Sequence, residues 1–139
     1  MTGRVLPIPD ESSVEFWEAA GRHQLVLARC SRCQGRCHPP DVVCPRCHHP
    51  DPAFRFEPAD GAGTIRSWIT VRQAFLPGFD AEVPFVLVDV ALDEDDEVRL
   101  IGRLVDGPDT PLAIGARARL EFEDLSPEIS VPAFALEQR

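Results

Sequence analysis

Two pairs of cysteines constrain the fold of this chain more than any other feature of its sequence. The pairs are Cys30-Ser31-Arg32-Cys33 and Cys44-Pro45-Arg46-Cys47. Each pair places two thiolates on one side of a tight turn, and two facing turns form a tetrahedral site of four sulfurs, which suits zinc. The ten residues between the pairs are fewer than the roughly 15–20 of the common template, but they still fit a zinc ribbon. A redox CxxC motif is the alternative, and two copies so close together disfavour it.

Four thiolates would also determine the role of the metal. They fill a tetrahedral zinc ion and leave no open position for water or substrate, so the sequence predicts structural Zn2+ and no redox cofactor. The predicted ligands are Cys30, Cys33, Cys44 and Cys47. A strand is expected over residues 24–28, leading into the first cysteine turn. Because the segment has few apolar residues, metal binding is expected to supply most of its folding free energy.

Length and termini bound the class of protein. The 139 residues suggest one domain or two small ones. No run of 18 apolar residues is present, so no membrane span is expected. Residues 1–7 lack the apolar region of a secretion signal. Paired free thiols without such a signal predict a cytoplasmic protein in a reducing compartment.

The net charge of −9 is unevenly distributed. Residues 61–139 carry fifteen acidic residues against seven arginines, which makes them a poor partner for phosphate backbones. The zinc segment is locally basic through six arginines, namely Arg22, Arg29, Arg32, Arg36, Arg46 and Arg55. Such a basic patch suits the phosphates of coenzyme A, nucleic acid or an acidic partner face, and Arg36 is its candidate contact residue. A solvated rim is the structural alternative.

Composition and turn residues divide the chain into three segments. These are an arm with a short helix, a zinc ribbon and a barrel, over residues 1–23, 24–57 and 58–139. The helix is expected over residues 12–21, with Ser12 or Ser13 as its N-cap and Gly21 at its end. Prolines mark residues 50–60 as a connector.

From Gly61 onward, short strands alternate with turn signals. Five strands are expected, over residues 63–71, 84–92, 98–105, 116–123 and 131–136. Gly102 in the third strand is expected at a bulge or a strong bend. Five short strands without a long helix favour a five-stranded OB-fold barrel, with a small sandwich as the alternative. The predicted fold class is therefore mainly β.

Large apolar residues outside these strands are candidates for partner or ligand contacts. Phe16 and Trp17 are adjacent, so either one of them faces a second surface or both pack in an irregular core. Phe75, Leu76 and Phe79 lie in the loop between the first two barrel strands. OB folds commonly bind ligands there, and exposed aromatic residues anchor protein interfaces. Base stacking is the alternative use, which the acidic barrel disfavours.

The remaining reactive side chains provide no convincing catalytic set. Cys37 beside His38 is a candidate nucleophile, but a base must approach the sulfur to about 3 Å, and neighbours in sequence rarely point at each other. His48 could act as a metal ligand only if one thiolate of the symmetric quartet stayed unused, so a position in a solvated loop is favoured for it. The sequence therefore predicts no catalytic residue.

Two acidic features of the barrel are also interpreted as structural. Residues 93–97 are five consecutive acidic residues, typical of a solvated hairpin tip that protects an edge from aggregation. Asp89 lies in an apolar strand and requires either a partner, such as Arg66 or Arg103, or an outward position.

The order of these features resembles one family, long regarded as a domain of unknown function and associated with acyl-CoA metabolism. It joins an N-terminal helix and a rubredoxin-like zinc ribbon to a C-terminal OB fold. The resembling positions are Phe16-Trp17, the cysteine quartet, Pro39-Pro40, Gly61-Ala62-Gly63-Thr64-Ile65, Pro84-Phe85-Val86 and Gly115. The chain departs from the family at Gln34, where glycine is common, and at His38, where an aromatic residue is common.

The resemblance also implies a function. Members resemble accessory subunits that accompany thiolase-like proteins or are fused to hydratases. In actinobacteria, a similar domain partners a thiolase-like lipid-transfer protein that acts as an aldolase on steroid side chains. We therefore expect a non-catalytic subunit that binds and activates such an aldolase, with an acyl-CoA thioester at the shared interface and no nucleic acid or membrane. The alternatives are an OB-fold module for single-stranded nucleic acid and an independent acyl-CoA hydrolase or hydratase.

Overall fold

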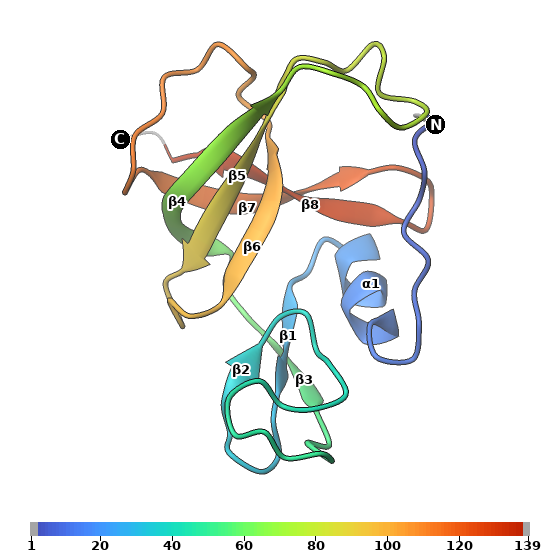
Figure 1. Cartoon of the computed structure of the whole chain (residues 1–139), viewed down its shortest axis with the longest axis vertical. Helices are drawn as coiled ribbons and strands as arrows, with labels where there is room; N and C mark the ends of the chain where they lie inside the picture. The colour runs from blue at the N-terminus through green and yellow to red at the C-terminus, as the bar shows by residue number, and fades with distance from the viewer. Residues whose placement is uncertain (1–2, 138–139) are drawn as a thin grey trace.

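The structure, a computed structural model, describes residues 3–137. One helix is followed by three short strands and then by five longer strands (Figure 1). These elements are α1 (Val14–Gly21), β1 (Val26–Arg29), β2 (Arg36–Cys37), β3 (Arg55–Pro58), β4 (Ala62–Val71), β5 (Phe85–Leu92), β6 (Arg99–Leu104), β7 (Arg117–Asp124) and β8 (Ser130–Leu136). Among the described residues, no helix has the length and apolar character needed to cross a bilayer.

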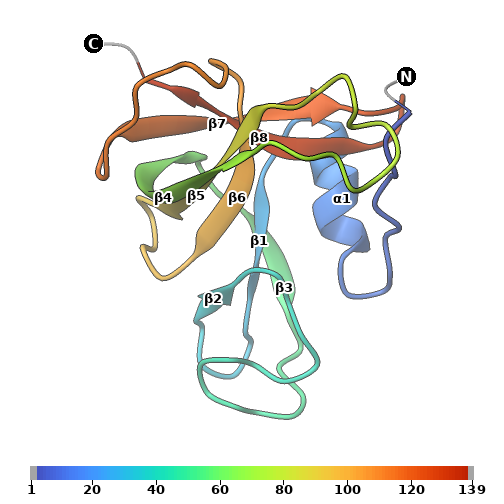
Figure 2. The ribbon, with the colours of Figure 1, turned by 45° about the horizontal axis from the view of Figure 1, so that its top comes forward.

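Helix α1 covers one end of the barrel. Its buried residues, Phe16, Ala19 and Ala20, follow the three- and four-residue spacing of a single helix face. They pack against β8 and β1, and Figure 2 shows α1 beside these two strands. Residue 13 occupies the N-cap position as expected, but its side chain caps no helical N–H group. Instead, the carboxylate of Asp10 accepts hydrogen bonds from both the N–H group and the hydroxyl of Ser13.

The ribbon is a three-stranded antiparallel sheet with the order β2-β1-β3. The strand expected over residues 24–28 is confirmed as β1, displaced by one or two residues. The prediction that residues 50–60 form only a connector was wrong, because β3 pairs with β1 from Arg29↔Arg55 to Val26↔Pro58. A four-residue strand that contains proline has a weak local signal, and its partner lies 26 or more residues away.

The C-terminal segment is a closed barrel with the order β4-β5-β6-β8-β7. All five expected strands are present, and the closure excludes the sandwich alternative. β6 and β8 pair in parallel and the other neighbours pair antiparallel. Gly102 serves close packing: a Cβ there would lie 2.8 Å from the carbonyl oxygen of Pro132. The irregularity of the sheet lies instead in β4, between Ile65 and Ser67.

The core fills the barrel and continues under α1. Its largest fully buried side chains include Phe134, Leu27, Ile65, Leu92 and Leu100. Leu27 comes from the ribbon and the other four from the barrel. One apolar core therefore joins the two parts, and burial of these side chains is its main stabilising contribution.

The acidic turn between β5 and β6 is exposed at Asp93, Glu94, Asp96 and Glu97, as predicted for residues 93–97, but it also forms ion pairs with the ribbon, which the prediction did not include. It lies beside the ribbon, close to β2 (Figure 1). Arg36 forms an ion pair with Glu94 at 2.9 Å. Arg46 forms ion pairs with Asp95, also at 2.9 Å, and with Glu97. Two arginines of the ribbon, Arg36 and Arg46, are thus neutralised by the acidic turn.

The acidic residue in the apolar strand also has a different partner from those predicted. Asp89 forms an ion pair with Arg99. The residue directly opposite Asp89 on β6 is Ile101, and Arg99 lies two residues before it. The hydroxyl of Ser67 also donates to Asp89. The prediction of Arg66 or Arg103 was wrong because strand pairing sets Arg99 diagonally opposite Asp89 on β6.

Candidate metal centre and partner-binding face

The four paired cysteines meet at one point of the ribbon. Their Sγ atoms all lie within 4.8 Å of one another. The Cys30–Cys47 and Cys33–Cys44 sulfur distances are both 3.8 Å. A tetrahedral zinc ion with Zn–S bonds of about 2.3 Å requires sulfur separations of about 3.8 Å. The described cysteines therefore fit a single metal ion of the zinc type.

The two cysteine turns have the same backbone pattern. The N–H of Gln34 donates to the carbonyl oxygen of Cys30, and the N–H of His48 donates to that of Cys44, each at 2.9 Å. Gln34 and His48 both have positive φ, 65° and 63°, which is the conformation that favours glycine. The backbone N–H of Arg32 donates to the sulfur of Cys30 at 3.3 Å, and that of Arg46 donates to the sulfur of Cys44 at 3.4 Å. This repetition orients both pairs toward one centre.

The surroundings of the centre shift the pKa values of two of its cysteines in opposite directions: burial and the neighbouring sulfurs raise the pKa of Cys47 to about 11, whereas the pKa of Cys44 is lowered. Backbone N–H groups of Cys47 and Arg46 lower the pKa of the Cys44 thiol to about 6. A thiol that loses its proton readily is a ready metal ligand. The sulfurs of Cys30 and Cys44 are buried, whereas Cys33 and Cys47 are exposed, so the centre lies at the surface of the ribbon with one side covered.

The fifth cysteine and its neighbour belong to the packing of the ribbon. Burial raises the pKa of Cys37 to about 11, so at neutral pH it remains a protonated thiol. Burial lowers the pKa of His38 to about 4, and its ring packs on Phe16 with centroids 4.7 Å apart. His48 is exposed and lies outside the group of four sulfurs. None of these side chains has the environment of an activated nucleophile.

A second candidate site is the outer face of β4, β5 and β6 with the β4–β5 loop. We call it the apolar face, and it consists of Ile69, Leu87, Ile101, Phe75 and Leu76. Ile69 is directly opposite Leu87, and Ile101 is 64 % exposed. In the loop, Phe75 is 85 % exposed and Leu76 is 59 % exposed. The second and third strands and the first loop are the usual ligand-binding surface of an OB fold, and exposed large apolar side chains at that place make it a candidate interaction site.

The structure separates the predicted contact residues into two groups. Phe75 and Leu76 are exposed, while Phe79 is half-buried and packs against Phe85 with centroids 5.7 Å apart. Phe16 is only 5 % exposed and contacts Trp17 edge to face. Of the two alternatives for the helix aromatics, packing in the core therefore holds for Phe16. Trp17 is half-buried and packs against the core. Arg36 is partly buried by its ion pair with the acidic turn.

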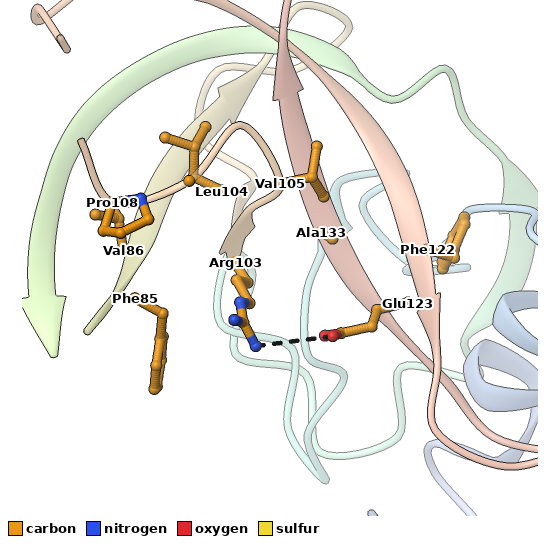
Figure 3. Close-up of a pocket in the computed structure, with 10 residues that line it drawn as sticks. Phe85, Val86, Arg103, Leu104, Val105, Pro108, Phe122, Glu123 and Ala133 are labelled. Atoms are coloured by element: carbon orange, nitrogen blue, oxygen red, sulfur yellow. Dashed lines mark ion pairs between the residues drawn. The ribbon is translucent and has the colours of Figure 1, made fainter. Parts of the chain in front are cut away.

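A cavity of about 300 Å³ lies beside the parallel strands β6 and β8 (Figure 3). Its one lining cation, Arg103, is within 2.9 Å of Glu82 and 3.8 Å of Glu123, and it lies over the ring of Phe85. Glu123 also forms an ion pair with Arg4 of the N-terminal arm, at 2.9 Å. Because its cation is already neutralised, the cavity is poorly suited to an anion; this network instead attaches the arm to the barrel.

A ribbon with four clustered cysteines joined to a closed OB barrel defines a protein of the zinc-ribbon and OB-fold class. The family model for the C-terminal OB-fold domain of ChsH2 matches residues 56–123. A chain of the solved Ltp2-ChsH2(DUF35) aldolase is similar with a TM-score of 0.78 and 30 % identity, over 94 % of this chain and 98 % of that one. The chain therefore belongs to the ChsH2-like DUF35 family.

Two further relatives are more distant or only partly covered. A DUF35 protein of unknown function from Sulfolobus solfataricus has a TM-score of 0.59 at 13 % identity, over 91 % of this chain and 86 % of that one, and shows the shared fold. A probable enoyl-CoA hydratase alpha subunit from Thermomonospora curvata is 34 % identical over 122 residues. The match includes 86 % of this chain but 36 % of the relative, so the chain spans about a third of that curated protein.

Proposed function

We propose that this chain is a non-catalytic accessory subunit of a thiolase-like acyl-CoA enzyme. The observation that carries the proposal is the similarity to a chain of the Ltp2-ChsH2(DUF35) aldolase over nearly the full length of both chains. The hydratase subunit from Thermomonospora curvata supports a setting in acyl-CoA chemistry. The favoured reaction is retro-aldol cleavage of a steroid side-chain CoA thioester, with the chemistry on the partner and activation by this chain.

The metal in this proposal is zinc, held by Cys30, Cys33, Cys44 and Cys47. Four thiolates occupy every position of a tetrahedral ion, so zinc would supply folding free energy rather than chemistry. It would keep the ribbon in the conformation in which Arg36 and Arg46 contact the barrel. Thiolate ligands of this kind are maintained in a reducing compartment such as the cytoplasm.

The partner would dock on the apolar face. Phe75 and Leu76 extend from the β4–β5 loop with little contact of their own, and burial of such side chains is a typical source of binding free energy. The shared interface is also the proposed location of the acyl-CoA thioester.

The acidic excess of residues 61–139 argues against the nucleic-acid alternative, and both arginines of β6 are already paired. Arg99 is paired with Asp89, and Arg103 with Glu82. Positive charges that are already neutralised contribute little to binding of a phosphate backbone.

The experiment is reconstitution with a thiolase-like aldolase subunit. We expect this chain to co-purify with that subunit and to raise its rate of CoA-thioester cleavage. The F75A/L76A variant should weaken the complex while retaining the melting temperature, because both side chains are exposed; V42A, at an exposed ribbon position, is the matched control. The absence of a complex and of any effect on rate would refute the proposal, and thioester turnover by this chain alone would refute its non-catalytic role.

A further inference from the structure

The outer half of β4 has a neighbouring strand on one side only. β5 pairs with β4 as far as Val71, but β7 pairs only with the first three residues, Ala62 to Thr64. On the β7 side, the last backbone hydrogen bonds are those of Ile65 with Gly115 and Ala116. Among the described residues, no strand covers this side of residues 67–71, which we call the β4 edge. The irregularity between Ile65 and Ser67 marks the point where the edge separates from the barrel.

The β4 edge lacks the usual protection of an exposed strand. Its sequence, Ser67-Trp68-Ile69-Thr70-Val71, contains no charge, no proline and no glycine. Three of the five residues are β-branched, which favours the strand conformation. Residues 66–70 are all exposed. Exposed edges normally carry charges or proline because bare ones pair with other chains, so an edge of this composition indicates a pairing site.

Two arginines bracket the β4 edge. Arg66 precedes it and Arg72 follows it. Four other arginines of the described barrel are held in ion pairs, namely Arg99, Arg103, Arg117 and Arg119. Arg66 and Arg72 form no ion pair with any residue from 3 to 137. Although residues 61–139 have a strong excess of acidic residues, both ends of this edge are positive.

The charges decide which occupant fits. Two copies of this chain that pair symmetrically about Ile69 would place Arg66 of one copy opposite Arg72 of the other. Like charges directly opposite each other destabilise a sheet, so a second copy is disfavoured. An extended segment with apolar residues in the middle and carboxylates near its ends would instead satisfy both arginines and the free backbone groups.

We propose that the β4 edge receives such an extended, acidic-ended segment of the thiolase-like partner, as an added strand of the sheet; this inference rests on the proposed function. Ile69 belongs both to the edge and to the apolar face, so the added strand and the surface around Phe75 form one continuous interface. Backbone hydrogen bonds supply the register, and the two arginines supply selectivity and faster association.

Hydrogen–deuterium exchange of the full chain, alone and bound to the thiolase-like aldolase subunit, tests the proposal. In the complex, the alternate amides of residues 67–71 that point away from β5 should exchange at least about tenfold more slowly, because the added strand accepts their hydrogen bonds. The R66E/R72E variant should bind at least about tenfold more weakly through loss of two ion pairs, and added salt should weaken the wild-type complex more than the variant. R22E, with the same change of charge at the end of α1, is the matched control, and R66S/R72S separates loss of charge from repulsion.

The outcomes distinguish the two proposals. Protection of the edge with weak binding by R66E/R72E supports both. A complex in which residues 67–71 exchange as in the free chain, and which R66E/R72E forms normally, overturns the added strand and leaves the accessory role intact. The absence of any complex overturns both.

Discussion

Replacement of Arg46 by alanine should loosen the attachment of the ribbon to the barrel. Arg46 lies within the second cysteine turn and reaches the acidic β5–β6 turn, where it contacts Asp95 at 2.9 Å and also contacts Glu97. Its Nε donates to the carbonyl oxygen of Arg36 at 2.7 Å. Gly35 permits this path, since a Cβ there would lie 2.4 Å from Cδ of Arg46. One side chain thus links the second cysteine turn and β2 to the barrel.

The burial of each partner determines the expected magnitude. The Arg46 and Asp95 side chains are 30 % and 23 % exposed, whereas Glu97 is 70 % exposed. Exposed pairs contribute about 0.2–1 kcal/mol, and hydrogen bonds to charged groups about 1.5–3 kcal/mol. We therefore assign about 1.5 kcal/mol of folding free energy to the Arg46–Asp95 contact, and about 1 kcal/mol to the contacts of Arg46 with Glu97 and the carbonyl oxygen of Arg36 together. R46A should lower the melting temperature by about 10 °C for a domain of this size.

A double-mutant cycle of R46A and D95A measures this contribution. Urea unfolding of the metal-loaded proteins, followed by circular dichroism, should give a coupling energy of about 1–1.5 kcal/mol that decreases with added salt. R22A removes an arginine that has no ion pair among the described residues and should change stability by less than about 0.5 kcal/mol. If the two losses add, with a coupling below about 0.3 kcal/mol, Arg46 does not connect the ribbon to the barrel through Asp95.

Three further predictions concern the metal centre, the core and the surface. C44S should reduce bound metal to well below one equivalent by elemental analysis and lower ribbon stability, as a chelator should in the wild type; full metal retention would contradict the four-sulfur site. F134A should destabilise the protein by about 3–5 kcal/mol in urea unfolding, because Phe134 is fully buried, and a smaller loss would mean that the barrel collapses around the gap. Arg117 lowers the pKa of Asp93 below its ordinary 3.8, so the stabilisation is present above about pH 4 and is lost as the pH falls. D93N should therefore be less stable than wild type at pH 7, and the difference should narrow as the pH falls below about 4; a difference that does not change with pH would contradict this.

Some features of the molecule were predictable because they depend on local sequence. The metal centre requires two pairs of cysteines, each within a single turn, and the spacing of Cys30, Cys33, Cys44 and Cys47 already specified which sulfurs meet. The barrel strands were predictable because runs of alternating or continuous apolar residues are separated by turn residues. The β3 strand was missed because its signal is its pairing with β1, which is a property of the folded sheet.

Other features depend on residues that are far apart in the chain. The sequence contains a basic ribbon and an acidic turn, and considered separately both suggest solvated surfaces. The fold brings Arg36 to Glu94 and Arg46 to Asp95, because closure of the barrel directs the β5–β6 turn toward the ribbon. Burial of Phe16 likewise depends on the packing of α1 against β8 and β1.

The sequence by itself determined the two parts of this protein, a ribbon with four clustered cysteines and a five-stranded barrel, since each follows from local spacing and periodicity. Only the tertiary structure decided which charges remain available. Most arginines of the described residues form ion pairs with carboxylates elsewhere in the chain, whereas Arg66 and Arg72 at the ends of the β4 edge do not, nor do Arg22 and Arg55. Strand pairing and charge pairing are long-range properties, and they direct the candidate interaction surface to the apolar face and the β4 edge.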